Sequence, residues 1–243
     1  MAFNFGSLAN VKPASTTSYL KAYTINENVT IKSSEITSGT SATTGKPWKC
    51  LKITFGNDEG IFTDSIFFID DSDGSKDFDR KSYDMPNGGK RETPSAWENF
   101  EAKISAIGFA FFPDNFKKLQ ANANKFKNFE ELMNYFKKMV DAAAGKTTTS
   151  MKLVGRNTNG RVFAALPNCL GIAQAKDQKR ASENGVEIGQ WYTWLQSPFG
   201  DKLSFSAYEM QQKNAIDNAT PTDMSAVTED ESFDSSDLLD LDL

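Results

Sequence analysis

"WKCLKITFGNDEGIFTDSIFFI", residues 48–69, decides the fold class, because it holds two apolar runs joined by a turn. Both runs, 48–55 and 61–69, are rich in β-branched and aromatic residues, which favour strands. The "GNDEG" between them is typical of a turn. Neither run has a purely polar face, so we expect partial cover on both faces of this hairpin.

Further strands are predicted on both sides of this hairpin. Alternating apolar residues and turn signals favour a second hairpin at 151–167, with its turn at Asn159-Gly160. The same signals predict strands at 18–25 and 28–36, with a turn at Asn26-Glu27, and at 186–196 and 202–210.

A helical segment is predicted between the two hairpins. After the flexible loop 38–47 and the first hairpin comes a long polar loop, 70–92, and then Thr93 as an N-cap before Pro94. An apolar stripe predicts a helix from there to Pro113, and a second helical region covers about 114–144.

The order of strands, helices and strands predicts a mainly β fold with a helical insertion. A five-stranded Greek-key barrel of the OB type fits it, with the helices between the third and fourth strands; an α+β fold with an open antiparallel sheet is the alternative. We expect a flexible arm at 1–17, one nucleic-acid-binding domain at 18–213 with the insertion at about 93–145, and a disordered acidic tail at 214–243.

Composition closes off several classes of function. The chain has no His and only two Cys, which removes Ser-His and Cys-His nucleophile pairs and His-containing zinc sites. No apolar run approaches the roughly 18–20 residues of a membrane span, and no secretory signal is evident. We therefore expect an intracellular protein without cofactor or membrane partner, in the host cytoplasm if it is encoded by a phage.

The net charge of −5 hides two parts of opposite sign. The segment from Asn214 onward holds nine of the 32 acids and no Lys or Arg. The preceding residues hold all 27 basic side chains and the other 23 acids, a net charge of +4. A basic body with an acidic tail indicates a nucleic-acid interaction under charge control.

Basic and aromatic residues interleave in the body, as single-stranded nucleic acid requires for phosphate contact and base stacking. For any one of these residues, a core or ordinary surface role is the alternative. The candidate binding residues are Lys46, Trp48, Lys49, Lys52, Phe55, Lys152, Arg156, Arg161, Trp191 and Tyr192.

The acids between Asp70 and Asp79 are the only candidate for metal-dependent chemistry. They lie in one loop with Lys76 interspersed, and the loop does not fit the ligand positions of an EF-hand. A two-metal nuclease draws carboxylates from several rigid elements. We therefore expect a solvated loop here, and a metal-dependent nuclease remains an alternative function.

The layout as a whole resembles the single-stranded DNA-binding proteins of bacteriophages, of the T7-like kind. The resemblance rests on a barrel with a helical insertion, a basic and aromatic body and an acidic tail, and it covers most of the chain without a matching signature string. It implies DNA binding without sequence preference, in replication, recombination or repair, by a protein that is not an enzyme. It also implies a tail that competes with DNA and docks partners such as polymerase, helicase or primase.

The tail combines dense negative charge with apolar residues. Seven acids between Glu229 and Asp242 mimic a run of phosphates, and the interspersed leucines suit a pocket on a partner. Tails of the resembled family usually end in an aromatic residue, whereas this chain ends at Leu243. The candidate partner-binding residues are Asp230, Glu231, Phe233, Asp234, Asp237, Leu238, Leu239, Asp240, Leu241, Asp242 and Leu243.

Two rival functions stay open beside DNA binding: the metal-dependent nuclease, and an assembly or adaptor protein that binds no nucleic acid. A homodimer is equally open, because the sequence does not determine the oligomeric state.

Overall fold

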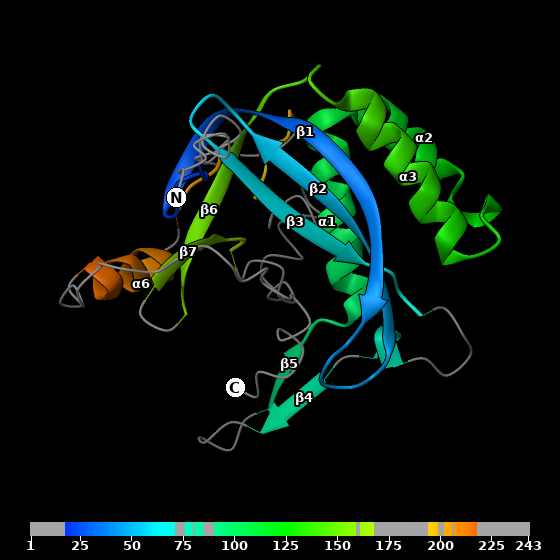
Figure 1. Cartoon of the computed structure of the whole chain (residues 1–243), viewed down its shortest axis with the longest axis horizontal. Coiled ribbons are helices and arrows are strands. Elements are labelled where there is room, and N and C mark those ends of the chain that lie inside the picture. Colours follow the sequence, from blue (N-terminus) through cyan, green and yellow to red (C-terminus); the bar gives the residue numbers. More distant parts are fainter. Residues whose placement is uncertain are drawn as a thin grey trace, which may run out of the picture.

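The computed structural model describes residues 18–70, 76–79, 81–84, 90–158, 161–167, 194–198, 202–205 and 207–217. Five strands form one antiparallel sheet in the order β3-β2-β1-β6-β7 (Figure 1). They are β1 (Thr24–Thr40), β2 (Pro47–Gly56), β3 (Ile61–Phe67), β6 (Thr149–Thr158) and β7 (Arg161–Ala165). The two predicted hairpins are thereby confirmed as β2–β3 and β6–β7. Within the described residues no pairing joins β3 to β7, so the sheet is open there.

The central strand β1 differs from the prediction. We expected two strands with a turn at Asn26-Glu27, but β1 runs continuously through these residues. Asn28 adopts a left-handed backbone with φ of 57°, and the register against β6 shifts between Asn26 and Val29. The turn signals therefore mark a bulge, which bends β1 so that it pairs with β6 at its start and with β2 further on.

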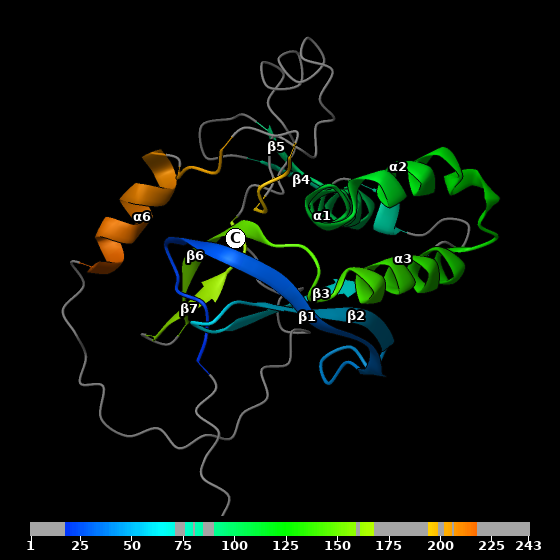
Figure 2. The ribbon, with the colours of Figure 1, turned by 90° about the horizontal axis from the view of Figure 1, so that it is seen from above.

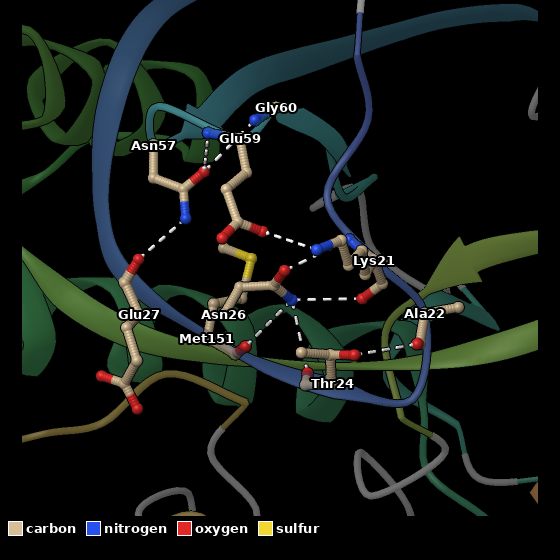
Figure 3. Close-up of polar contacts among 9 residues, drawn as sticks. All are labelled: Lys21, Ala22, Thr24, Asn26, Glu27, Asn57, Glu59, Gly60 and Met151. Atoms are coloured by element: carbon tan, nitrogen blue, oxygen red, sulfur yellow. Dashed lines mark hydrogen bonds and ion pairs between the residues drawn. The ribbon is translucent and has the colours of Figure 1, made fainter.

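The buried amide of Asn26 fixes this bend (Figure 3). The side chain is only 4% exposed, and its Oδ1 accepts a hydrogen bond from the N–H of Lys21 at 3.1 Å. Its Nδ2 donates to the carbonyl oxygens of Lys21, Thr24 and Met151 at 3.2, 3.3 and 3.5 Å. One side chain thus joins the entry to β1 with β6.

The β2–β3 turn is tied to the same region by a second amide. Nδ2 of Asn57 donates to the carbonyl of Glu27 at 2.8 Å, and its Oδ1 accepts from the N–H groups of Glu59 and Gly60. Lys21 pairs with Glu59 at 3.0 Å, as Figure 3 also shows. The turn, the bulge and β6 therefore meet at one polar junction.

Three helices follow β3 in the chain and precede β6, which confirms a helical insertion between the third and fourth strands of the sheet. They are α1 (Ala96–Phe111), α2 (Pro113–Ala121) and α3 (Phe129–Ala143). Ser95 caps α1 in a capping box with Glu98, so the prediction of Thr93 as the N-cap is wrong. Thr93 instead ends strand β5.

The helices all lie on one side of β1–β3 (Figure 2). We call the side of the sheet that they cover the inner face and the opposite side the outer face. On the inner face, Leu51, Ile53 and Phe55 of β2 are fully buried. Gly108 permits close packing of α2 on α1, because a Cβ there would come within 2.2 Å of the Phe116 ring.

Polar contacts at the edge of this core fix α3 on β1. Asp141 of α3 accepts hydrogen bonds from Ser34 of β1 and from Lys137. Burial raises the pKa of Asp141, but these hydrogen bonds and the charge of Lys137 outweigh it, so the pKa lies below its usual value. The carboxylate is thereby kept charged at neutral pH.

Two segments that we expected to be irregular or extended fold otherwise. The polar loop 70–92 contains η2 (Lys76–Phe78) and a hairpin of β4 (Lys81–Asp84) and β5 (Lys90–Thr93). The strand predicted at 202–210 is wrong, because helix α6 (Ala207–Asp217) occupies its end. This helix also continues past residue 213, where we expected the body to end.

The remaining predicted elements fall largely outside the described residues. Of the strand expected at 186–196, only Trp194, Leu195 and Gln196 are described, with Leu195 bridged to Met151. The N-terminal arm 1–17 and residues 218–243 also lie outside them. None of the described helices is long and apolar enough to cross a membrane.

Replacing Asn26 with Ala should lower the free energy of unfolding by about 1–3 kcal/mol, because it leaves buried backbone groups without partners. Urea unfolding followed by circular dichroism measures the change. Asn57→Ala is the matched control, with a smaller expected loss because water reaches that turn. Equal losses in the two variants would contradict a special role for the Asn26 junction.

Candidate nucleic-acid interface

The candidate residues of β2 are divided between the two faces of the sheet. Side chains alternate along a strand, so Trp48 and Lys52 point to the outer face while Lys49 and Phe55 point to the inner face. The interleaved pattern in the sequence therefore does not form one surface.

Phe55 belongs to the core and corrects the prediction that it stacks on bases. Its ring is 0% exposed and lies 5.9 Å from the ring of Phe111 and 5.4 Å from that of Trp194. A ring enclosed in this way is not accessible to a nucleotide.

Lys49 serves the attachment of α3. Its ammonium group pairs with Glu130 and lies 5.0 Å from the centre of the Phe68 ring. Lys49 is therefore separated by the sheet from Trp48 and Lys52, and its charge is already balanced.

The outer face of β1–β3 carries an aromatic pair. The Trp48 ring lies over Gly39, where a Cβ would come within 2.7 Å of the ring, and contacts Phe67 edge-on at 6.1 Å. Both rings are half-buried. Since Gly39 leaves the Trp48 ring room to lie on the strand, the pair forms a flat apolar patch.

Two candidate lysines lie on or beside this outer face. Lys52 is half-buried, with Glu35 and Ser65 as its register neighbours on β1 and β3, and Lys46 is exposed in the β1–β2 turn. Neither forms an ion pair with another described residue, and no described helix covers the face. The patch is thus bordered by cations available to a ligand.

Lys152 corrects a second prediction, because it is buried. The residue is 8% exposed, and its Nζ donates to Oε1 of Glu209 at 3.1 Å and to the carbonyl of Ser204 at 3.0 Å. It also lies 5.7 Å from the centre of the Phe205 ring. Lys152 therefore holds α6 against β6 and is not a phosphate contact.

The β6–β7 hairpin brings together the most accessible cluster. Arg156 is directly opposite Phe163 in the register, and Arg161 lies two residues before Phe163 on the same face. All three are exposed, Phe163 to 49%. Neither arginine forms an ion pair with a residue that the structure describes.

Phe163 was missed by the sequence analysis, although a signal for it existed. The sequence predicts a two-residue turn at 159–160, and such a turn fixes a register that pairs position 156 with position 163, as the structure has it. Counting outward from the turn would have identified Phe163 as the aromatic partner of both arginines.

The remaining candidate residues of the sequence analysis, which are Trp191, Tyr192 and the tail residues 230–243, lie outside the described residues. Trp194, which precedes the bridged Leu195, is fully buried in the core.

The acidic loop forms no metal site within the described residues. Asp77 accepts a hydrogen bond from the N–H of Asp70 at 2.9 Å, and no described group of three or more potential ligands could hold a metal ion. Residues 71–75 of this loop are not among the residues described.

A hollow of about 370 Å³ lies at the start of α3, away from the candidate cluster. Phe126 and Tyr135 line it, their rings 5.4 Å apart, together with Glu130, Glu131 and Lys138. Two carboxylates against one ammonium make this hollow unfavourable for phosphates.

Comparison of the chain with family models, curated proteins and solved structures finds no match.

Proposed function

We propose that this protein binds single-stranded DNA without sequence preference, in replication, recombination or repair. The observation that carries the proposal is the exposed Phe163 ring between Arg156 and Arg161. An exposed ring offers a stacking surface for any base, and two guanidinium groups that form no ion pair with a described residue suit the phosphates that follow that base. Chemistry of this kind discriminates little between sequences.

The strand order supports an OB-type fold for this function. In OB folds the face of the second and third strands binds the strand of nucleic acid, together with the loops between strands 1 and 2 and strands 4 and 5. The corresponding regions here are the outer face with Trp48 and Lys52, the β1–β2 turn with Lys46, and the β6–β7 hairpin. The cations that are unpaired among the described residues thus lie in the three regions that such a fold uses.

The acidic tail fits this proposal as a competitor for the same cations. Helix α6, which ends at Asp217, is held against β6 by the ion pair of Lys152 and Glu209. Strand β6 also carries Arg156. The chain therefore enters the tail close to the β6–β7 hairpin, where its acids could replace phosphates and its leucines could reach a replication partner.

An assembly or adaptor function would use the same hairpin differently. Val162 and Phe163 are both exposed apolar residues, which also suit a protein contact. A protein with that function would not bind oligonucleotides, so replacing the two arginines would have no effect on an oligonucleotide titration.

Phe163→Ala should weaken binding to oligo-dT by about 5- to 150-fold, the loss of one stacked base. Fluorescence titration at low salt measures it. Tyr135→Ala, which removes an equally exposed ring (46%) from α3, is the matched control and should bind like the wild type. If the wild type itself binds no oligonucleotide at low salt, the proposed function is wrong and the adaptor function is favoured instead.

Changing Arg156 and Arg161 together to Gln should reduce the salt dependence of binding. Each phosphate contact contributes about 0.7 to the slope of log K against log salt concentration for single strands, so the slope should flatten by about 1.4. The same double change at Lys118 and Lys125, which are exposed on the helical segment, is the control. An equal effect there would mean that the cations act only through net charge.

Deleting residues 229–243 should tighten oligo-dT binding several-fold at low salt, with the difference shrinking as salt rises. It should also abolish capture of polymerase, helicase or primase, if these are the partners. Replacing only the four leucines of the tail by Ser separates the roles, since it should spare the competition and remove the capture. Unchanged affinity after deletion would refute the competition.

A further inference from the structure

The hollow at the start of α3 has walls unlike those of the candidate nucleic-acid interface. It measures about 370 Å³, and its lining includes Phe126, Tyr135 and Glu131. The centres of the two rings lie 5.4 Å apart, and Tyr135 is 46% exposed. Two aromatic rings and an acid therefore border a space that a side chain of another molecule can enter.

The periodicity of α3 places these residues side by side. One side of the helix packs into the core through residues such as Met133 and Phe136, which are fully buried. A second stripe is exposed, with spacings of three and four residues that bring side chains together on a helix. This stripe consists of Glu131, Asn134, Tyr135 and Lys138, and all four line the hollow.

Hydrogen bonds at the start of α3 fix the walls of the hollow. Asn128 is the N-cap, and its Oδ1 accepts from the N–H of Glu131 at 2.9 Å. In turn, Oε2 of Glu131 accepts from the N–H of Lys127 at 2.8 Å. Phe126 is half-buried and packs against the core. The carboxylate and one ring are thus held in place before a ligand arrives, which lowers the cost of binding.

The rings and the nearest carboxylate favour a positively charged ligand. The face of an aromatic ring attracts a cation, because the quadrupole of the ring is negative there. Glu131 lies four residues before Tyr135, so its carboxylate is next to that ring. A carboxylate accepts about four hydrogen bonds, and the N–H of Lys127 uses one of them. Glu131 can therefore still accept hydrogen bonds from a ligand.

The other charges of the hollow leave this preference in place. Glu130 adds a second carboxylate, although its ion pair with Lys49 balances its charge. Lys138 is the one cation among the described residues that line the hollow, and it lies about 10 Å beyond Glu131 along the helix axis. A cation at the Glu131 end of the hollow is therefore kept apart from Lys138.

Acids at the start of a helix also stabilise the helix, because the positive end of its dipole lies there. This role accounts for Glu130 and Glu131 without a ligand. It does not account for Tyr135, whose exposed ring lies one turn further along α3 and beside Phe126. The pair of rings is therefore the observation that indicates a ligand.

We propose that the hollow binds an arginine side chain of a partner protein. The planar guanidinium stacks on the Tyr135 ring and donates two parallel hydrogen bonds to the Glu131 carboxylate. The carboxamides of Asn128 and Asn134, which line the same hollow, bind the peptide groups beside that arginine. These carboxamides favour a protein segment over a free amine as the occupant.

This inference does not rest on DNA binding. Helix α3 and the β6–β7 hairpin lie well apart in both views of the molecule (Figures 1 and 2). A partner bound at α3 therefore leaves the hairpin accessible. We accordingly expect Tyr135→Ala to weaken the binding of the partner and to leave the affinity for oligo-dT like that of the wild type.

A short blocked peptide with arginine at its centre and glycine on both sides tests the proposal. Added to the ¹⁵N-labelled full chain, it should shift the backbone amide signals of residues 126–138 in a saturable way. The same peptide with citrulline, which has the shape of arginine without its charge, should bind about 3- to 30-fold more weakly. It loses both the ion pair and the cation–π contact.

The sign of each charge change makes the test specific. Glu131→Gln should weaken binding of the arginine peptide about 2- to 5-fold, whereas Lys138→Gln should tighten it about 2-fold because it removes a like charge. Asp114→Asn is the control and should have no effect, since Asp114 is an exposed acid of α2 that does not line the hollow. A substitution that acted only by disturbing the fold would not tighten binding.

The aromatic ring has its own pair of variants. Tyr135→Ala should weaken binding of the arginine peptide about 2- to 5-fold, the value of a cation–π contact at an exposed site. Tyr135→Phe keeps the ring and should bind like the wild type. Urea unfolding of each variant shows whether the fold is kept.

Three results would overturn the proposal. The first is equal binding of the arginine and citrulline peptides, and the second is the absence of shifts at residues 126–138. The third is a reversal of the charge effects, in which Glu131→Gln tightens binding and Lys138→Gln weakens it. A wild type that binds no oligo-dT would refute the proposed function and leave this site as it is.

Discussion

The bend of β1 at Asn26 is the constraint on which the rest of the structure depends. One strand must leave the ladder with β6 and enter the ladder with β2, which requires backbone groups at the bulge to find other partners. The Asn26 amide supplies them by reaching Lys21, Thr24 and Met151. Without this bend, the β6–β7 hairpin would not hold a fixed position relative to the outer face of β1–β3, and Arg156 and Arg161 would have no fixed relation to Trp48 and Lys52.

Much of the fold could be predicted, because it is encoded locally. The β2–β3 and β6–β7 hairpins have short turns between alternating strands, and α1 has a helical apolar stripe that ends before Pro113. The errors arose where distant residues decide the outcome. Asn26 looks like a turn residue until the carbonyl of Met151, 125 residues away, accepts its hydrogen bond. The helix α6 likewise depends on Lys152, a partner far from it in the sequence.

The candidate site shows the same limit at the level of single side chains. Alternation along β2 separates Trp48 from Phe55, yet the sequence alone does not say which face the helices cover. Lys152 resembled a surface cation because its partner, Glu209, belongs to a segment predicted to be a strand. Arg156 and Arg161, two of the candidate binding residues, are both exposed, and the register of the strands that carry them follows from the two residues between these strands. The register of β4–β5 could not be inferred, because its five-residue connection does not determine one.

The buried Lys152–Glu209 ion pair determines where helix α6, and with it the start of the acidic segment, lies on the surface of the protein. Burying two charges is costly unless each is paired and hydrogen-bonded, and here both conditions are met. The pair fixes α6 beside β6, the strand that also carries Arg156. Helix α6 ends at Asp217, so on the proposed function the acidic residues that follow it would compete for the cations of the β6–β7 hairpin at high local concentration. A tail attached elsewhere could keep the protein in solution equally well, and this point of attachment is the reason why we propose competition with a polyanion, rather than solubility, as the role of its charge.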